Sequence, residues 1–105
     1  MEIYGLNLLS LSASLSAEIY SEIFGMKIIE KSEKHSEIQS SSGIKIIFSP
    51  DDKNCRVSPG SITIQGSPSE KFIQSDFFKI EQTFPHNKYL SYLDKYDNRI
   101  WFILN

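Results

Sequence analysis

The sequence predicts an α+β protein in which two β-α-β-β-β modules form one cupped mixed sheet. Three observations carry this prediction. Isoleucine, phenylalanine and tyrosine are abundant, which favours strands. In each half of the chain, a helix-forming segment follows the first apolar segment, and three more strand-like segments come after it. The element order of residues 1–49 therefore repeats in residues 60–105, after a polar linker over residues 50–59.

The length of 105 residues suits a single compact domain made of both modules. One such module alone would expose a large apolar sheet face, which has to be buried against another element. We therefore expect the two modules to lie side by side and to complete one domain together.

The first module begins with a largely apolar segment, Ile3–Leu11, which predicts a strand. A helix is expected from about Leu15 to Phe24, because apolar residues recur every four positions there. Ser14 is a candidate for the residue that caps its start, and Gly25 for the residue that ends it. Three further strands are predicted at Lys27–Glu30, Ser36–Gln39 and Gly43–Phe48.

The second module begins with Ser61–Gln65, where apolar and polar residues alternate as in a strand. Ser67 can then cap a short helix, with Pro68 at its first position and Glu70 completing a capping box. This helix is expected to extend to about Ser75. Three further strands are predicted at Phe77–Glu81, Lys88–Leu93 and Arg99–Leu104.

Two short motifs resemble the vicinal oxygen chelate superfamily, which includes glyoxalases, bleomycin-resistance proteins and extradiol dioxygenases. The superfamily ends in a D-P-D-G-N-x-I-E-L pattern, and this chain reads Asp94-Lys95-Tyr96-Asp97-Asn98-Arg99-Ile100-Trp101. Its first helix ends in F-Y-x-x-x-L-G-F, which Tyr20 and Gly25 match. The resemblance covers almost the whole chain and implies a glyoxalase/bleomycin-resistance-like fold.

The resemblance also implies where a metal would bind. Metal-dependent members hold a divalent cation with His and carboxylate ligands at equivalent points of the two modules. Those points fall near Leu8, Phe48, Ser61 and Trp101 in this sequence, and none of these residues is a good ligand. Alignment shifts of one or two residues offer only Asn7, Ser10, Thr63 and Gln65. We therefore expect neither a metal nor another cofactor.

The remaining reactive residue types do not form a catalytic pattern. His35 lies in a charged turn and His86 precedes a strand, without the spacing of metal ligands, so both are interpreted as solvated loop residues. Cys55 is the only cysteine, which excludes an internal disulfide, and it is interpreted as a passive loop residue. No catalytic residue is predicted.

The predicted site is a ligand-binding surface around Trp101. If this side chain keeps the direction of the ligand Glu of the family, it points into the cup. It then either fills the cup or forms the floor of an aromatic pocket. Tyr89 and Tyr92 point to opposite faces of their strand, so one of them is expected to join Trp101. The predicted ligand-binding residues are Trp101, Leu8, Ser61, Phe48, Tyr89 and Tyr92.

The composition argues against several classes of partner. The net charge is −2, and without a basic block nucleic acid is not an expected partner. No apolar segment approaches the roughly 20 residues of a membrane helix. The amino-terminal residues lack the basic region of a signal peptide. We therefore expect a soluble cytoplasmic protein with no membrane partner.

Three functions remain open at this point. The first is a metal-free protein that binds a small apolar or aromatic molecule. Bleomycin-resistance relatives resemble this and imply a homodimer. The second is a metal-dependent lyase, isomerase or dioxygenase whose ligands lie elsewhere in the sequence. The third is a structural or interaction protein whose cup is filled. An enzyme is disfavoured because the usual metal ligands are missing.

Overall fold

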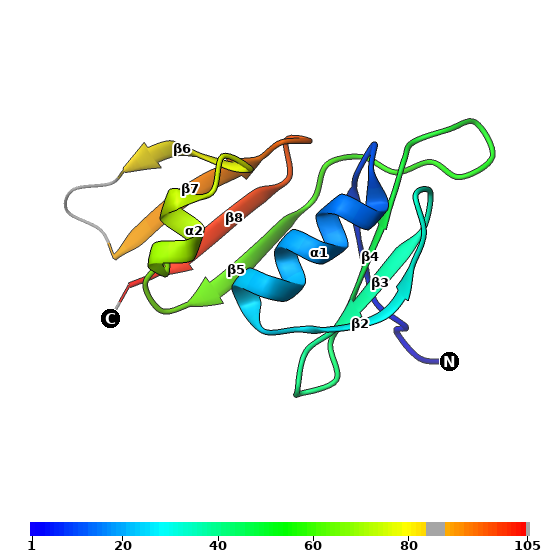
Figure 1. Ribbon diagram of the computed structural model, residues 1–105, viewed down its shortest axis with the longest axis horizontal. Coiled ribbons are helices and arrows are strands. Elements are labelled where there is room, and N and C mark those ends of the chain that lie inside the picture. The colour runs from blue at the N-terminus through cyan, green and yellow to red at the C-terminus, as the bar shows by residue number, and fades with distance from the viewer. Residues whose placement is uncertain (84–87, 105) are drawn as a thin grey trace. The chain divides into compact units, whose positions relative to one another are not determined.

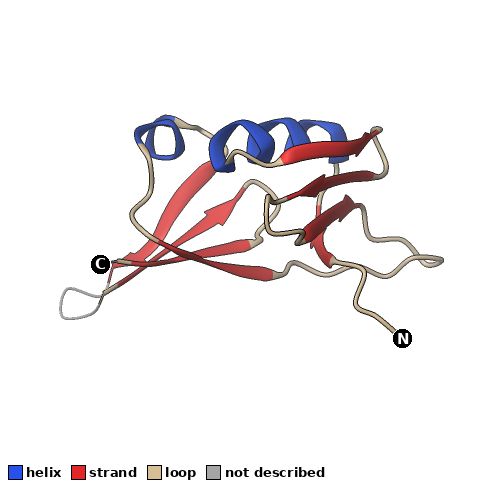
Figure 2. Ribbon diagram, turned by 90° about the horizontal axis from the view of Figure 1, so that it is seen from below, coloured by secondary structure: helices blue, strands red, loops and turns tan. Residues whose placement is uncertain are grey.

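The computed structural model describes residues 1–83 and 88–104 of the chain (Figure 1). The chain divides into two compact units, Met1–Ser58 and Pro59–Asn105. Over the described residues, each unit has one four-stranded sheet and one helix, and the helix covers one face of its sheet (Figure 2). We call the opposite face the helix-free face. The interpretation of His86 falls outside the described residues.

The first unit has the element order β-α-β-β-β. Its strand order is β1-β4-β3-β2, in which β1 runs parallel to β4 and the other neighbours are antiparallel. Its elements are β1 (Leu6–Leu9), α1 (Ala13–Phe24), β2 (Lys27–Lys31), β3 (Ser36–Gln39) and β4 (Lys45–Ser49).

Several boundaries in the first unit differ from the prediction, and the largest differences are in β1 and at the start of α1. β1 is shorter than the predicted Ile3–Leu11, because only its four residues pair with β4. The helix α1 starts earlier than predicted, since the Ala13 N–H donates to the Glu33 carbonyl and the Ala13 side chain is fully buried. Ser14 therefore lies inside the helix, and its hydroxyl donates to Glu33 at 2.7 Å.

The end of α1 is as predicted. Gly25 follows the last helical residue with φ of 66°, a left-handed conformation that glycine adopts at no steric cost. Its N–H donates to the Ser21 carbonyl, which would otherwise lack a partner within the helix. Gly25 thus ends the helix and turns the chain into β2.

The core of the first unit lies between α1 and its sheet. Tyr20 in α1 and Phe48 in β4 are both 0% exposed, with ring centroids 4.9 Å apart. Phe48 therefore faces α1. Its Cα partners across the sheet, Leu8 and Ser36, share that face and are also buried.

The second unit repeats this arrangement. Its strand order is β5-β8-β7-β6, again with one parallel pair, β5 with β8. Its elements are β5 (Ser61–Gln65), α2 (Glu70–Gln74), β6 (Phe78–Thr83), β7 (Tyr89–Asp94) and β8 (Arg99–Ile103). The α+β class and the two β-α-β-β-β modules are confirmed.

The start of α2 corrects the predicted capping box. Ser69, rather than Ser67, is the N-cap, and its hydroxyl accepts a hydrogen bond from the Phe72 N–H at 3.2 Å. Glu70 is accordingly the first helical residue, and Pro68 lies outside the helix. The later start places Phe72 over the sheet.

Aromatic packing holds α2 against its sheet. Phe72 is 1% exposed, and its ring centroid lies 4.2 Å from that of Phe78, 4.7 Å from that of Tyr92 and 4.9 Å from that of Phe102. These contacts identify the side of the second sheet that faces α2. Neither helix in the described ranges has the length and apolar character needed to cross a membrane.

Candidate ligand-binding face

Trp101 lies on the helix-free face of the second sheet. Its neighbour Phe102 contacts α2, and side chains alternate along a strand, so Trp101 points the other way. Its Cα partners are Thr63 in β5 and Ser91 in β7. Trp101 is therefore flanked by a hydroxyl-bearing residue on each neighbouring strand.

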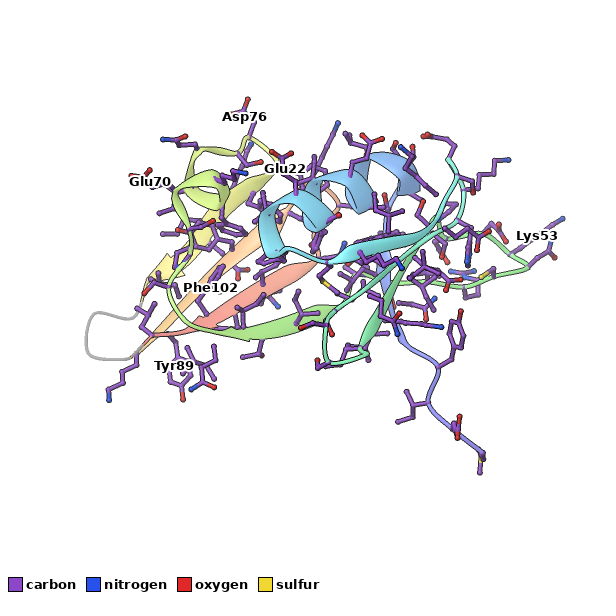
Figure 3. All side chains as sticks on the ribbon, turned by 60° about the horizontal axis from the view of Figure 1, so that its bottom comes forward. Glu22, Lys53, Glu70, Asp76, Tyr89 and Phe102 are labelled. Atoms are coloured by element: carbon purple, nitrogen blue, oxygen red, sulfur yellow. The ribbon has the colours of Figure 1, made fainter. Side chains whose placement is uncertain are left out.

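The two predicted tyrosines separate as expected for one strand. Tyr92 faces α2 and is 9% exposed. Tyr89 is 45% exposed and is the Cα partner of Ile103, which shares the face of Trp101. Figure 3 shows Tyr89 projecting from the side of the sheet away from α2. Tyr89 is thus the tyrosine that shares a face with Trp101.

Ser61 also lies on this face, at the start of β5. It is exposed, and its Cα partner is Arg99 in β8. Both positions are two residues from the Thr63 and Trp101 pair, so they belong to the same face. The structure therefore brings together three of the six predicted residues, Ser61, Tyr89 and Trp101.

Leu8 and Phe48 do not join this group. They belong to the first unit, where they face α1 with 1% and 0% exposure, so no ligand on the helix-free face can touch them. On that sheet the helix-free face carries Asn7 and Ile47 as one Cα pair and Leu9 and Ser49 as another. A displacement of one position along a strand reverses the face, which is why the alignment placed these two residues differently.

A polar network borders Trp101. Arg99 holds Glu81 by two bonds, from Nε to Oε1 at 2.7 Å and from Nη2 to Oε2 at 2.6 Å. The Ser91 hydroxyl donates to the same Oε1 at 2.9 Å. The hydrogen bond from Arg99 holds the pKa of Glu81 below its ordinary value, and the same contact raises the pKa of Arg99.

Sequence reasoning missed Glu81, which it treated only as the end of a strand. The pairing of β6 with β7 shifts between Ile80 and Gln82, so Glu81 sits at an irregularity. A bulge of this kind leaves no local sequence signal. Alternation along β6 from Phe78, which faces α2, puts Glu81 on the side of the sheet that carries Arg99 and Ser91.

The parallel strand pairs do not fit a divalent cation at the positions that the family resemblance implies. Strands β1, β4, β5 and β8 contain no histidine, aspartate or glutamate within their bounds. Of the shifted candidates, Ser10 is fully buried and bonds Ser16 at 2.7 Å. Asn7, Thr63 and Gln65 supply neither imidazole nor carboxylate. No reaction step through a metal follows from these positions.

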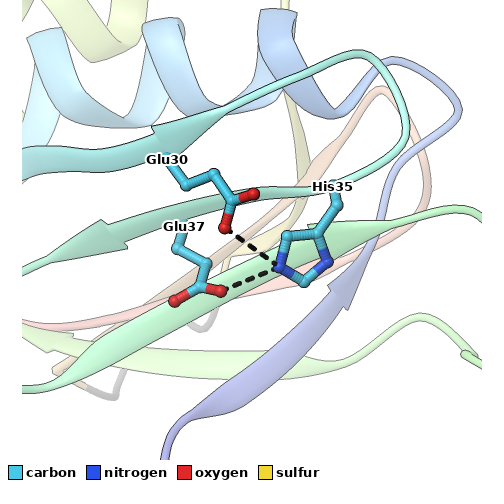
Figure 4. A group of neighbouring side chains, drawn as sticks. All are labelled: Glu30, His35 and Glu37. Atoms are coloured by element: carbon cyan, nitrogen blue, oxygen red, sulfur yellow. Dashed lines mark hydrogen bonds and ion pairs between the residues drawn. The ribbon is translucent and has the colours of Figure 1, made fainter.

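A second group of ionisable side chains lies in the first unit. His35 Nε2 is 2.8 Å from Glu37 Oε2 and 3.8 Å from Glu30 Oε2 (Figure 4). The interpretation of His35 as merely solvated is therefore corrected. Hydrogen bonds from Tyr4 and then from His35 hold the pKa of Glu37 below its ordinary value.

This group could not be found from the spacing of its members. Glu30 and Glu37 are seven positions apart and become Cα partners only through the pairing of β2 with β3, which shifts between Ile28 and Glu30. The charged turn that contains His35 was visible in the sequence. Its contact with both carboxylates required the register of the hairpin.

Comparison with known proteins identifies the fold. No protein-family model and no curated protein matches the chain. Among solved structures, protein ATC0852 from Agrobacterium tumefaciens matches with a TM-score of 0.76 at 14% identity, over 99% of this chain and 97% of that one. A possible glyoxalase from Bacillus cereus matches with a TM-score of 0.64 at 15% identity, over 98% of each chain.

The fosfomycin resistance protein FosX from Listeria monocytogenes, complexed with Mn(II) and a sulfate ion, is a third neighbour. It matches with a TM-score of 0.68 at 13% identity, over 99% of this chain and 90% of that one. The chain therefore has the fold of the vicinal oxygen chelate superfamily, as the two sequence motifs implied. That superfamily includes metal-dependent enzymes.

Proposed function

We propose that this protein binds a small apolar or aromatic molecule on the helix-free face of its second sheet, without a metal at the positions used by metal-dependent relatives. The position of Trp101 carries this proposal. Trp101 lies between its Cα partners Thr63 and Ser91, on a face that α2, the described helix of the unit, does not cover. An aromatic surface bordered by hydroxyl groups is the usual chemistry of a small-molecule site.

The residues around Trp101 indicate the ligand class. A flat ring can stack on the indole, and Tyr89 adds a second aromatic surface on the same face. Ser61 and Thr63 offer hydroxyls to a polar substituent. Arg99 is already bound to Glu81 in a two-point ion pair, so its charge is balanced within the site. This arrangement favours a neutral, largely planar molecule.

We also propose that the protein is a cytoplasmic homodimer. Dimerisation is supported by the resemblance to bleomycin-resistance proteins, whose modules pair to complete a ligand site. A cytoplasmic location is supported by the single cysteine, which leaves the described chain without an internal disulfide.

The proposal is tested by native mass spectrometry of freshly purified protein, followed by fluorescence titration. Trp101 is the only tryptophan, so its emission reports on this face alone. We expect extra mass from a bound organic molecule. Titration with N-phenyl-1-naphthylamine, a small neutral aromatic probe, should change the emission of Trp101 in a saturable way.

Variants then locate the binding surface. Trp101→Ala should weaken the probe about tenfold, because it removes the stacking surface. Ile73→Ala, in the exposed part of α2, is the control and should bind like wild type. A stoichiometric metal that is retained in a His35→Gln variant, and so does not depend on the Glu30, His35 and Glu37 group, would favour the enzyme reading instead. A bare species with no saturable probe binding would favour a structural or interaction role.

A further inference from the structure

The hairpin of β2 and β3 brings one imidazole and two carboxylates together in the first unit (Figure 4). Glu30 and Glu37 are Cα partners, so their side chains share one face of the sheet. That face is the helix-free one, because the adjacent Ser36 pairs with Phe48, which packs on α1. His35, in the connecting turn, completes a group whose three ligand atoms all lie within 4.8 Å of one another.

Neighbouring lysines balance the charges of this group only in part: the positive charge of Lys45 lowers the pKa of Glu37, but less than the hydrogen bonds from Tyr4 and His35 do. Two carboxylates placed opposite each other on one sheet face repel, so a positive charge between them is favoured. Lys31 Nζ instead bonds Glu18 at 2.7 Å, and Lys45 Nζ lies 4.0 Å from the centroid of the Tyr4 ring. His35 is the group, within the described ranges, that contacts both carboxylates.

A hydrogen bond from outside the group orients the carboxylate of Glu37. The Tyr4 hydroxyl donates to Glu37 Oε1 at 2.6 Å, and Glu37 is only 7% exposed. This bond leaves Glu37 Oε2 directed at His35. Metal sites orient their ligating carboxylates through outer hydrogen bonds of this kind.

We propose that Glu30, His35 and Glu37 form a binding site for a divalent transition-metal cation such as Zn²⁺. One imidazole nitrogen and two carboxylate oxygens are ligands that such ions accept, and a dication neutralises both carboxylates. The site lies in a different unit from the proposed ligand-binding face. It is also separate from the parallel strand pairs where metal-dependent relatives hold their ions.

Small side-chain rotations would bring the ligand atoms of His35, Glu30 and Glu37 to the separations that a bound Zn²⁺ requires. On a tetrahedral ion with bonds of about 2.0–2.1 Å, two ligand atoms lie about 3.3 Å apart. The contact from His35 to Glu37 would open from 2.8 Å and that from His35 to Glu30 would close from 3.8 Å. Each change is about half an ångström. A remaining coordination position would be open to water.

The test is calorimetric titration of the full chain, freed of metal with EDTA, with Zn²⁺ alone. Native mass spectrometry counts the bound ions, and we expect one per chain. His35→Gln and Glu37→Gln should each weaken binding at least tenfold, and Tyr4→Phe about tenfold through loss of the outer bond. Glu33→Gln, in the same turn, is the matched control and should stay within about twofold of wild type.

Further variants keep the test decisive. If circular dichroism shows that Glu37→Gln does not fold, Glu30→Gln replaces it, because the Glu30 side chain is 57% exposed. The Cys55→Ser variant should still bind Zn²⁺. Loss of Zn²⁺ binding in this variant would assign the metal to the exposed Cys55 thiol and overturn the proposal. Absence of saturable Zn²⁺ binding, or unchanged affinity in His35→Gln, would overturn it equally.

Discussion

A single buried residue, Asn98, ties the turn between β7 and β8 to the chain segment that enters β5. Its Nδ2 donates to Asp94 Oδ2 at 2.9 Å, and its Oδ1 accepts from the Gly60 N–H at 2.9 Å. We expect Asn98→Ala to lower the free energy of unfolding by about 1–3 kcal/mol, because it leaves buried polar groups without partners. Urea denaturation measures this change.

The control for that measurement is Asn54→Ala, at an exposed loop position, which should change stability by no more than about 0.5 kcal/mol. Equal effects of the two substitutions would contradict a structural role for Asn98.

Asp97, in the same turn, has φ of 68°. It stands where the family pattern has glycine, and aspartate is among the few residues that tolerate this conformation.

A second prediction at this scale concerns Trp101. We expect Trp101→Glu to leave the protein without tight Zn²⁺ or Mn²⁺ binding on the second sheet, because its Cα partners Thr63 and Ser91 are not metal ligands. The measurement is metal titration of Trp101→Glu in a His35→Gln background, which removes the proposed hairpin site. Tight binding by that double variant would show that further ligands converge on this face.

Among the elements, α2 is short and depends on one side chain for its attachment. Phe72 contacts the rings of Phe78, Tyr92 and Phe102. Phe72→Ala should lower the free energy of unfolding by about 3–5 kcal/mol, because it leaves a cavity among these rings. Ile73→Ala, at a neighbouring position that is 59% exposed, is the control and should change it little. Thermal unfolding followed by circular dichroism distinguishes the two.

The ion pair between Glu81 in β6 and Arg99 in β8 should make the stability of the protein depend on pH. The pKa of Glu81 is below its ordinary value of 4.5 in the folded protein, chiefly through its hydrogen bond from Arg99. A lowered folded pKa stabilises the protein above the unfolded pKa, and that contribution is lost as pH falls through the folded pKa.

We therefore expect wild type to lose stability relative to Glu81→Gln as pH falls below 4.5. Urea denaturation between about pH 6 and pH 3 measures this difference. Arg99→Gln should reduce the pH dependence in the same way, since removing either partner removes the cause of the shift. A parallel stability profile for wild type and Glu81→Gln would refute this explanation.

At the scale of the whole molecule, the proposed homodimer gives the fifth prediction. Sedimentation velocity should show a species of twice the 12.0 kDa chain mass at micromolar concentrations. Family modules pair to complete a ligand site, so the probe that changes Trp101 emission should also favour the dimer. A monomer at high micromolar concentration, with or without probe, would argue against pairing.

Much of this architecture could be predicted from local patterns. The strands Ser36–Gln39 and Ser61–Gln65 were predicted with the bounds that the structure has, because their residues alternate or lie between clear turn signals. The helix that ends at Gly25 was predicted for a similarly local reason. The first residues of the helices were predicted less accurately than their ends. The choice between Ser67 and Ser69 as the N-cap of α2, for example, depends on where Phe72 packs in the tertiary structure.

The sequence by itself determined the elements, their order and their repetition, because periodicity and capping act over a few neighbouring residues. Only the tertiary structure decided which faces Leu8 and Trp101 join, because a change of one position reverses the face of a strand. It also decided that His35 meets Glu37, and that Arg99 meets Glu81, in sheets whose pairing includes an irregularity. Strand register, which depends on partners far along the chain, brings these charges together.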